Sequence, residues 1–352
     1  MVFIVTPRAP RGRGSGVNPD NSFDSHHIEL DDEEAAGRAW RTEFLRDDTQ
    51  SIIVSNSASD LSFEASVNPY RGCEHGCAYC YARIYHEYLG YSAGIDFESK
   101  ILVKERAPQL LEKELAKRTY RPVKLSMSGV TDCYQPVEKK LELTRRCLEV
   151  LADFRNPVVV ITKNALVTRD LDHLAELARH GAVAVYLSIT TLDAKLARVL
   201  EPRASSPRAR LEAITQLAEA GVPAGVSAAP MIPGMTDHEL PGILEAVAAA
   251  GGTFGTYSTV RLPGAVAEVF SDWLEREFPD RKEKVLSRIR AVQGGRLNNT
   301  TPLERLRGTG EQAAQLRQMF QATCRRTGLA PSPPELSAAH FRRRQPGQGE
   351  LF

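Results

Sequence analysis

The chain has 352 residues, of which 42% are apolar and 25% charged, and its 45 basic and 44 acidic side chains nearly cancel. These values fit one large α/β enzyme domain with extensions, and a net charge of +1 gives no overall attraction to nucleic acid. No apolar run reaches the roughly 18 residues of a membrane span, so the sequence excludes a transmembrane helix and predicts no membrane partner.

Residues 1–40 are expected to form a flexible N-terminal tail. Their first five residues are apolar, but this run is too short for a signal-peptide core, and its charges follow it rather than precede it. Pro, Arg, Gly, Asp and Ser then dominate up to an acidic run at residues 31–34, a composition typical of disorder. Because nothing in the chain looks secreted, we expect a cytoplasmic protein in a reducing compartment.

A polar loop with three cysteines comes next. Cys73, Cys77 and Cys80 have the spacing Cys-x3-Cys-x2-Cys. Three thiolates can hold one soft metal centre, and a four-iron cluster held by only three cysteines keeps one iron free for an outside ligand. The spacing therefore indicates catalysis rather than scaffolding. The alternative is a structural zinc site with His75 or His86 as fourth ligand, although such sites usually draw on two separated ligand pairs.

From residue 60 onward, short apolar runs alternate with longer amphipathic stretches. The predicted strands are residues 61–67, 123–127, 157–161, 183–189, 222–228 and 253–260. The predicted helices are residues 108–117, 137–154, 170–180, 207–220 and 238–249. This alternation predicts βαβ units and a parallel sheet, but periodicity alone does not separate an open barrel from a doubly wound sheet. In either architecture, functional groups are expected at the carboxyl ends of the strands.

The cysteine loop resembles that of the radical S-adenosylmethionine (radical SAM) enzymes, in which an aromatic residue, here Tyr79, precedes the third cysteine. The resemblance makes Tyr79 a candidate cofactor-binding residue. The resemblance implies a [4Fe-4S] cluster and S-adenosyl-L-methionine (SAM), whose methionine group chelates the free iron. It implies reductive cleavage of SAM to a 5′-deoxyadenosyl radical, with a reductant of flavodoxin or ferredoxin type. It also implies a partial (β/α)6 TIM-type barrel over residues 41–265. Beyond the barrel, the sequence predicts a helical, basic C-terminal extension over residues 266–340 and a flexible tail over residues 341–352.

Polar residues after the predicted strands are candidates for SAM binding. Ser128, Thr131 and Asp132 follow the second strand, where radical SAM enzymes carry a Gly-Gly-Glu-like segment that this chain lacks. Lys163 follows the third strand and suits a carboxylate or phosphate, and Ser188 ends the fourth with a hydroxyl suited to ribose or carboxylate. Each residue alone is equally well explained as a helix cap or turn residue. Their placement at successive strand ends favours cofactor binding.

Further motifs resemble the spore-photoproduct-lyase-like branch of this superfamily over roughly residues 50–265. They are residues 66–73, residues 131–138, and Thr162-Lys163 with Arg169-Asp170. Spore photoproduct lyase splits a cross-linked thymine dimer, and a cysteine near the end of its second strand returns a hydrogen to the product radical. The nearest thiol here, Cys133, lies after Thr-Asp rather than before it. Cys133 is thus a hydrogen-donor candidate or, alternatively, a buried small apolar residue.

Two regions bear on a nucleic-acid partner. The helix after the cysteine loop carries Tyr81, Tyr85 and Tyr88, with Arg83 and His86 between them, and aromatic and basic groups together suit nucleic acid. The helical spacing of the tyrosines instead favours one packed stripe. Residues 281–307 hold eight basic side chains against two acidic ones, which suits either a phosphate backbone or a solvated helix face.

The chain ends in Gln348-Gly349-Glu350-Leu351-Phe352, which resembles the Gln-x-x-Leu-Phe peptide that hooks bacterial sliding clamps. The sequence as a whole therefore predicts a radical SAM enzyme that acts on DNA, as a lyase-like repair enzyme for a base lesion. One alternative is a maturase or small-molecule enzyme of the same branch. An alternative from a different class is a non-catalytic metal-binding or interaction protein.

Overall fold

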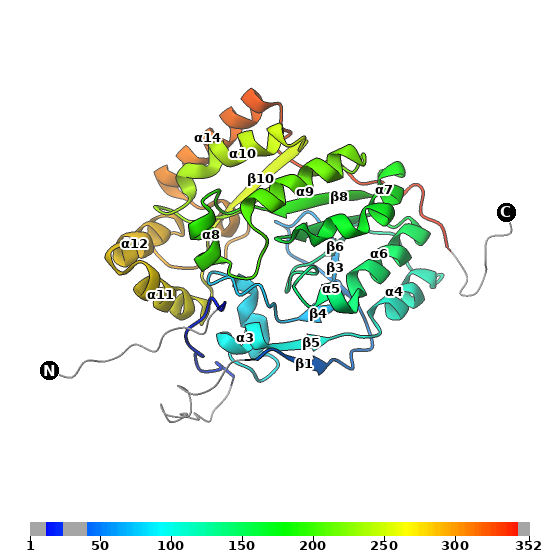
Figure 1. The fold of residues 1–352 in the computed structure, drawn as a ribbon, viewed down its shortest axis with the longest axis horizontal. Helices are drawn as coiled ribbons and strands as arrows, with labels where there is room; N and C mark the ends of the chain where they lie inside the picture. Colours follow the sequence, from blue (N-terminus) through cyan, green and yellow to red (C-terminus); the bar gives the residue numbers. More distant parts are fainter. Residues whose placement is uncertain (1–11, 24–40, 344–352) are drawn as a thin grey trace.

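The computed structural model describes residues 12–23 and 41–343, so the clamp-like peptide at residues 348–352 lies outside the described residues. Within them, the main sheet has seven strands in the order β10-β9-β8-β7-β6-β3-β2 (Figure 1). Its parallel strands are β3 (Ala65–Val67), β6 (Leu125–Met127), β7 (Val158–Thr162), β8 (Val183–Ser188), β9 (Ala224–Met231) and β10 (Phe254–Thr259). β2 (Ile53–Ser55) pairs antiparallel with β3 at one edge.

The strand order decides between the two architectures that the sequence left open. Each parallel strand pairs with the next one in chain order, whereas a doubly wound sheet reverses its order at a switch point. β10 and β2 remain as edges, and no strand pairing closes the sheet in the described part of the chain. The fold is therefore the expected α/β type, an open (β/α)6 partial barrel.

Amphipathic helices cover the outside of the sheet (Figure 1). They are α4 (Ala107–Ala116), α6 (Leu143–Phe154), α7 (Leu171–Arg179), α9 (Pro207–Glu219) and α10 (Leu240–Ala249). In α6 the buried positions Cys147, Leu148 and Leu151 recur at helical spacing, so one face meets the core. The helix predicted over residues 137–154 is divided, because Glu142 takes a left-handed conformation (φ 52°) that ends α5 (Glu138–Leu141).

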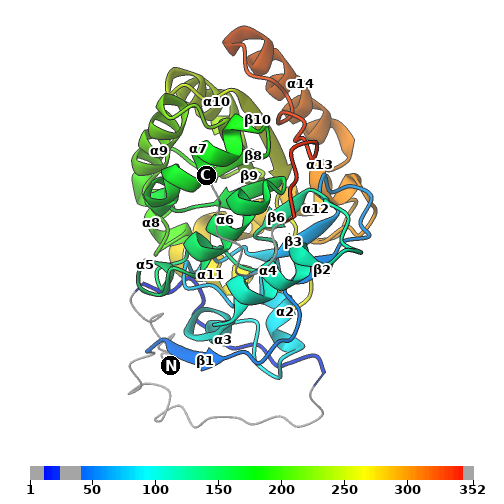
Figure 2. The ribbon, with the colours of Figure 1, turned by 90° about the vertical axis from the view of Figure 1, so that its right-hand side faces the viewer.

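A second, small sheet was not expected from the sequence. It consists of β1 (Glu43–Arg46), β5 (Lys100–Val103) and β4 (Tyr70–Arg71), and β1 lies at the lower end of the molecule in both ribbon views (Figures 1 and 2). These strands are too short for a periodic signal. Their function in the fold is clear from β4, which pairs with β5 and leads directly into the cysteine loop.

The C-terminal extension is helical up to residue 327. Its helices are α11 (Val266–Glu277), α12 (Lys282–Val292), α13 (Glu304–Arg307) and α14 (Gly310–Thr327), and the last three lie together on one side of the barrel in Figure 2. The chain then passes the amino ends of the strands: Ala330 bridges Phe254, and the Ser337 amide donates to the carbonyl of Gly181. No helix among the described residues is both long and apolar enough to cross a membrane.

Candidate functional site

The cysteine loop lies against the carboxyl ends of the parallel strands. Cys73 and Cys77 are buried, Cys80 is half-buried, and all three are free thiols. Cys73 and Cys80 belong to one apolar cluster around Phe97. Gly72 directly before Cys73 and Gly76 directly before Cys77 both have positive φ, a conformation that glycine adopts without strain.

The donor set of this loop fits an iron–sulfur cluster. Burial raises the pKa of Cys73, Cys77 and Cys80, so their thiolate forms require a neighbouring cation. Three soft sulfur donors without a fourth protein ligand suit a four-iron cluster that offers one iron to another molecule. Among the described residues, no three His, Cys, Asp or Glu side chains form a group that could hold a single metal ion.

Neither histidine considered for a zinc site joins the thiols. His75 places Nδ1 3.3 Å from Oδ2 of Asp132 and Nε2 3.4 Å from the amide nitrogen of Asn164. His86 packs edge-on against the Phe97 ring, and burial lowers its pKa to about 4, which keeps it neutral. His75 therefore lies against Asp132 and Asn164, and His86 against Phe97, and neither belongs to a metal-holding group among the described residues.

A buried ion pair between Arg83 and Glu98 fixes the loop from behind. Both side chains are 0% exposed. Arg83 donates from Nε (3.1 Å) and Nη2 (2.9 Å) to the carbonyl of Cys77, and from Nη1 to the carbonyls of residues 93 and 94. Arg83 is thus internal, and so is His86 at 1% exposure, which removes both from any surface that meets nucleic acid.

Residues 12–23 depart from the expectation of a flexible tail over residues 1–40. The amides of Gly14 and Ser15 donate to the two carboxylate oxygens of Glu98, at 3.1 and 2.9 Å. A Cβ on Gly14 would lie 1.8 Å from the carbonyl oxygen of Gly76, so the two backbones touch. A buried carboxylate needs hydrogen-bond donors, and these two backbone amides supply them to Glu98. The segment therefore packs as a strap along the cysteine loop.

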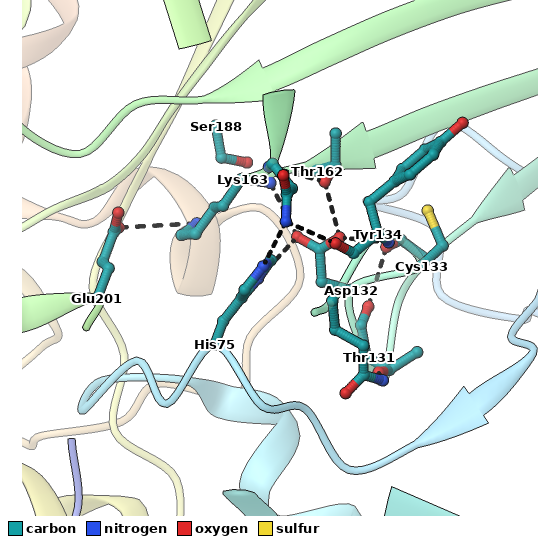
Figure 3. A network of polar contacts seen from close by, with 12 residues as sticks. His75, Thr131, Asp132, Cys133, Tyr134, Thr162, Lys163, Ser188 and Glu201 are labelled. Carbon is teal, nitrogen blue, oxygen red and sulfur yellow. Dashed lines mark hydrogen bonds and ion pairs between the residues drawn. The ribbon is translucent and has the colours of Figure 1, made fainter. Parts of the chain in front are cut away.

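Asp132 connects the loop to the strand ends (Figure 3). Its carboxylate accepts hydrogen bonds from the Thr162 hydroxyl (2.7 Å), the Lys163 amide (2.8 Å) and the Tyr134 amide (2.9 Å), and it faces His75. Burial alone would raise the pKa of Asp132, but His75 and the hydrogen bonds from residues 162 and 163 outweigh it and lower the pKa to about 2. The carboxylate is ionised and engaged with protein donors.

Ser128 and Thr131 are also engaged within the fold. Ser128, which has a positive φ of 133°, places its hydroxyl 2.9 Å from the carbonyls of both Thr131 and Ile161. The Thr131 hydroxyl donates to the carbonyl of Gly72 at 2.5 Å and accepts from the side-chain amide (Nε2) of Gln135 at 3.1 Å. These two hydroxyls tie the end of β6 to β7 and to the start of the cysteine loop.

Cys133 lies in the main hydrophobic core. It is 0% exposed, and its Sγ donates to the carbonyl of Met127 at 3.6 Å. Burial raises its thiol pKa well above the usual value. This environment matches the alternative of a small buried apolar residue, and a role as hydrogen donor would require the core to open.

A second polar network centres on Glu201, which follows α8 (Ala194–Leu200). Its carboxylate accepts from the hydroxyls of Tyr79 and Thr190 and pairs with Arg210, so the cysteine loop is bonded to the region beyond β8. Burial raises the pKa of Glu201, but the charges of Arg210 and Lys163 outweigh it and lower the pKa to about 2.

Lys163 lies between the two networks (Figure 3). Its Nζ is 4.0 Å from Oε1 of Glu201, 3.5 Å from the carbonyl of Ala229 and 5.8 Å from the centre of the Tyr79 ring. Ser188, at the last position of β8, is buried, and its carbonyl accepts from Arg210 at 2.7 Å. The structure thus brings Tyr79, Lys163 and Ser188 to one region beside the loop.

Sequence reasoning missed the partners that hold these groups. Arg210 lies on the amphipathic helix α9, where a lone arginine is ordinarily read as a solvated cation, yet it is 1% exposed. Glu98 and Gln135 likewise had no signal in the local pattern. Arg210 pairs with Glu201 nine residues away and Glu98 with Arg83 fifteen residues away, while Gln135 bonds the carbonyl of Gly72, 63 residues away. These separations match no helical or strand spacing rule.

Comparison with known proteins bears on this site. A family model for the radical SAM superfamily matches residues 67–247. An uncharacterised protein of Mycobacterium tuberculosis (strain ATCC 25618 / H37Rv) is 37% identical over 229 residues, which are 64% of this chain and 67% of that protein. An uncharacterised protein of Methanocaldococcus jannaschii is 33% identical over 173 residues, which are 49% of this chain and 62% of that protein.

Solved structures of spore photoproduct lyase share the fold over most of both chains. A variant with bound AdoMet and dinucleoside spore photoproduct aligns with a TM-score of 0.57 and 16% identity, covering 86% of this chain and 85% of that chain. The lyase complexed with dinucleoside spore photoproduct aligns with a TM-score of 0.58 at the same coverage. At this identity the similarity concerns the fold.

Proposed function

Because this chain belongs to the radical SAM superfamily, we propose that it directs a 5′-deoxyadenosyl radical at DNA and repairs a base lesion there. Membership makes it a radical SAM enzyme, with a [4Fe-4S] cluster and SAM as cofactors and a requirement for an external reductant. For the reductant we propose a protein of flavodoxin or ferredoxin type. The observation that supports the radical chemistry is the cysteine loop, held at the carboxyl ends of β6 to β8 by the two polar networks.

We assign Cys73, Cys77 and Cys80 as the cluster ligands. When bound, the cluster supplies the electron that cleaves the SAM sulfonium and so generates the radical. Lys163 offers an ammonium group for the SAM carboxylate, and Ser188 offers a hydroxyl nearby. Asp132 and Glu201 act on the loop itself, because their hydrogen bonds fix its position relative to the strand ends.

Two observations support DNA as the substrate. The fold aligns along most of its length with spore photoproduct lyase, whose solved structures contain a dinucleoside photoproduct. In addition, basic side chains of the segment 281–307, among them Arg281, Lys284, Arg290 and Arg296, are exposed and suit a phosphate backbone. Because Cys133 is buried, the group that returns a hydrogen to the product is not assigned to it.

The test is anaerobic reconstitution followed by turnover with SAM deuterated at the 5′ carbon, in the presence of ultraviolet-damaged or native DNA. We expect about four irons and four sulfides per chain, formation of 5′-deoxyadenosine, and deuterium exchange between SAM and the damaged DNA. SAM cleavage without any exchange with DNA would overturn the DNA assignment and favour the maturase or small-molecule alternative. Cluster binding without SAM cleavage would favour the non-catalytic alternative.

A further inference from the structure

The tyrosines after the cysteine loop are not packed as the helical spacing predicted. Tyr81, Tyr85 and Tyr88 are 40%, 42% and 67% exposed. Phe23, the last residue of the N-terminal strap, joins them and is 62% exposed. We call these four side chains the aromatic strip. The expected stripe was wrong because the three tyrosines do not lie on one helix and remain exposed. Tyr81 belongs to the 3-10 turn Tyr81–Arg83, Tyr85 to the short helix α2 (Ile84–Glu87), and Tyr88 follows that helix.

Three rings of the strip are in contact with one another, and the fourth, that of Tyr81, lies next to the cysteine loop. The ring centroids of Phe23 and Tyr88 are 4.8 Å apart, and those of Tyr85 and Tyr88 are 6.4 Å apart, with tilts of 35° and 32°. Tyr81 directly follows Cys80, and its hydroxyl donates to the carbonyl of Gly129 at 2.8 Å. The inner end of the strip therefore meets the carboxyl end of β6.

A positive charge lies over this inner end. The guanidinium of Arg261, just after β10, is 4.7 Å from the centre of the Tyr81 ring. Arg261 is half-buried, and among the described residues no carboxylate is within ion-pair distance of it. Asp60, whose charge also acts on Arg261, is itself bonded to Arg305. Arg261 is therefore available to an anionic ligand that lies on the strip.

We propose that the aromatic strip is a stacking platform for unpaired bases of a DNA strand, with Arg261 binding a phosphate of that strand. This inference rests on the proposed function and deepens it, because it specifies a DNA segment whose bases are unstacked. Exposed aromatic rings beside a cation provide stacking faces and charge for single strands without selecting a sequence. Bases inside an intact duplex cannot reach such faces, since they are already stacked on each other.

The strip is oriented so that it would guide a DNA strand toward the cysteine loop. Bases stacked on Tyr88 and Tyr85 would place the following nucleotides beside Tyr81, next to the cysteine loop. A damaged base that is already poorly paired costs least to bring into this position. The platform thus favours a lesion in a locally opened strand over a lesion in a fully paired duplex.

Fluorescence anisotropy with the reconstituted holoenzyme tests the platform. The probes are a labelled oligothymidine of about 12 nucleotides, the same strand in a duplex, and an oligouridine. We expect the double variant Tyr85→Leu/Tyr88→Leu to bind oligothymidine about 10- to 100-fold more weakly. Tyr85→Phe/Tyr88→Phe keeps the rings and should bind like the wild type. Phe44→Leu is the matched control, because Phe44 is 51% exposed on the separate strand β1.

A second measurement tests the cation. Arg261→Gln should weaken binding and reduce the slope of log affinity against log salt by about one, as expected for the loss of one phosphate contact. Arg208→Gln is the control, because the Arg208 side chain is 89% exposed on α9 and forms a surface ion pair with Glu212. It should leave both the affinity and the slope unchanged.

The outcomes separate this inference from the proposed function. Equal oligothymidine binding by the wild type and the Leu double variant, with deuterium still exchanged with DNA, would overturn the platform alone. Preferential binding of oligouridine, or self-association that disappears in the Leu variant, would overturn the assignment of DNA to this surface. A wild-type holoenzyme that cleaves SAM and binds no DNA would overturn both.

Discussion

Single residues around the cysteine loop act through buried partners rather than through exposed groups. Arg83 and Glu98 are completely buried and form an ion pair. Arg83 donates a hydrogen bond to the backbone of the loop, and Glu98 accepts one from the backbone of the strap. Glu201 and Asp132 perform the same task from the barrel side. Removing one member of such a pair leaves an uncompensated charge in the interior, which is costly.

The cysteines provide the first prediction at this scale. Cys77→Ala or Cys80→Ala should remove the bound iron and abolish SAM cleavage, because each substitution leaves two thiolates for the cluster. Cys147→Ala is the control: this thiol is 0% exposed in α6, so the variant should keep its iron. Iron and sulfide analysis after reconstitution measures the effect. A Cys77 or Cys80 variant with full iron content would contradict the ligand assignment.

Glu201 provides a prediction about stability and pH. Glu201→Gln should lower the free energy of unfolding at pH 7 by about 3 kcal/mol, because Arg210 then lacks a buried counter-charge. The folded-state pKa of about 2 lies below the usual glutamate value of about 4.3, so the carboxylate contributes stability above pH 4 that is lost as the pH falls toward 2.

The variant should therefore lose less stability than the wild type between pH 4 and pH 2. Urea unfolding followed by circular dichroism at pH 7, 4 and 3 measures both effects. Glu212→Gln is the control, because Glu212 is 54% exposed and its pair with Arg208 lies on the surface. Parallel acid profiles for the wild type and Glu201→Gln would show that Glu201 is not held ionised.

Whole segments determine how the cysteine loop is presented. The loop is entered from β4 of the small sheet, supported behind by the strap, and bonded in front to the segments after β6 and β8. The strap packs so closely that only glycine fits at residue 14. The loop is thus enclosed by segments that come from both ends of the barrel sequence.

The strap yields a prediction for hydrogen exchange. Gly14→Ala places a Cβ 1.8 Å from the carbonyl oxygen of Gly76, so the strap must move away. The Ser15 amide, which donates to Glu98, should then lose its protection from exchange. Gly242→Ala in α10 is the control, because the added Cβ would lie 3.9 Å from the side chain of Leu192, which is an ordinary van der Waals contact. Unchanged protection at Ser15 would show that the loop accommodates the added methyl group.

Across the whole molecule, the open sheet has two edges that the C-terminal extension brings into contact. Asp60, between β2 and β3, accepts from the Leu303 amide at 3.1 Å and forms a two-pronged ion pair with Arg305. Arg305 belongs to α13, which packs on β10. The pair therefore links the first and last strands of the barrel, a contact that strand pairing does not make among the described residues.

This link gives a prediction for global stability. Asp60→Ala should lower the free energy of unfolding by about 1 to 3 kcal/mol, and a double-mutant cycle with Arg305→Ala should show a favourable coupling. The exposed pair of Arg46 and Asp48, with side chains 66% and 76% exposed, is the control and should couple by less than about 1 kcal/mol. A coupling no larger than in the control pair would show that the link does not stabilise the barrel.

The amino-acid sequence by itself determined the local features of this protein. Periodicity located the six parallel strands, as for β8, expected over residues 183–189 and found at Val183–Ser188. Cysteine spacing identified the superfamily that the family model also matches. Both signals are local, because strand periodicity and ligand spacing depend on neighbours within a few residues.

Only the tertiary structure decided the strand order, the exposure of the tyrosines and the partners of the buried charges. The period of a helix shows which residues share a face, but not whether another element covers it, so Tyr85 was expected in a packed stripe and is exposed. The partners of Arg83 and Arg210 could not be read from local spacing, because Glu98 and Glu201 meet them only after folding. Burial and pairing are properties of the folded chain, and they determine which polar groups remain available to a ligand.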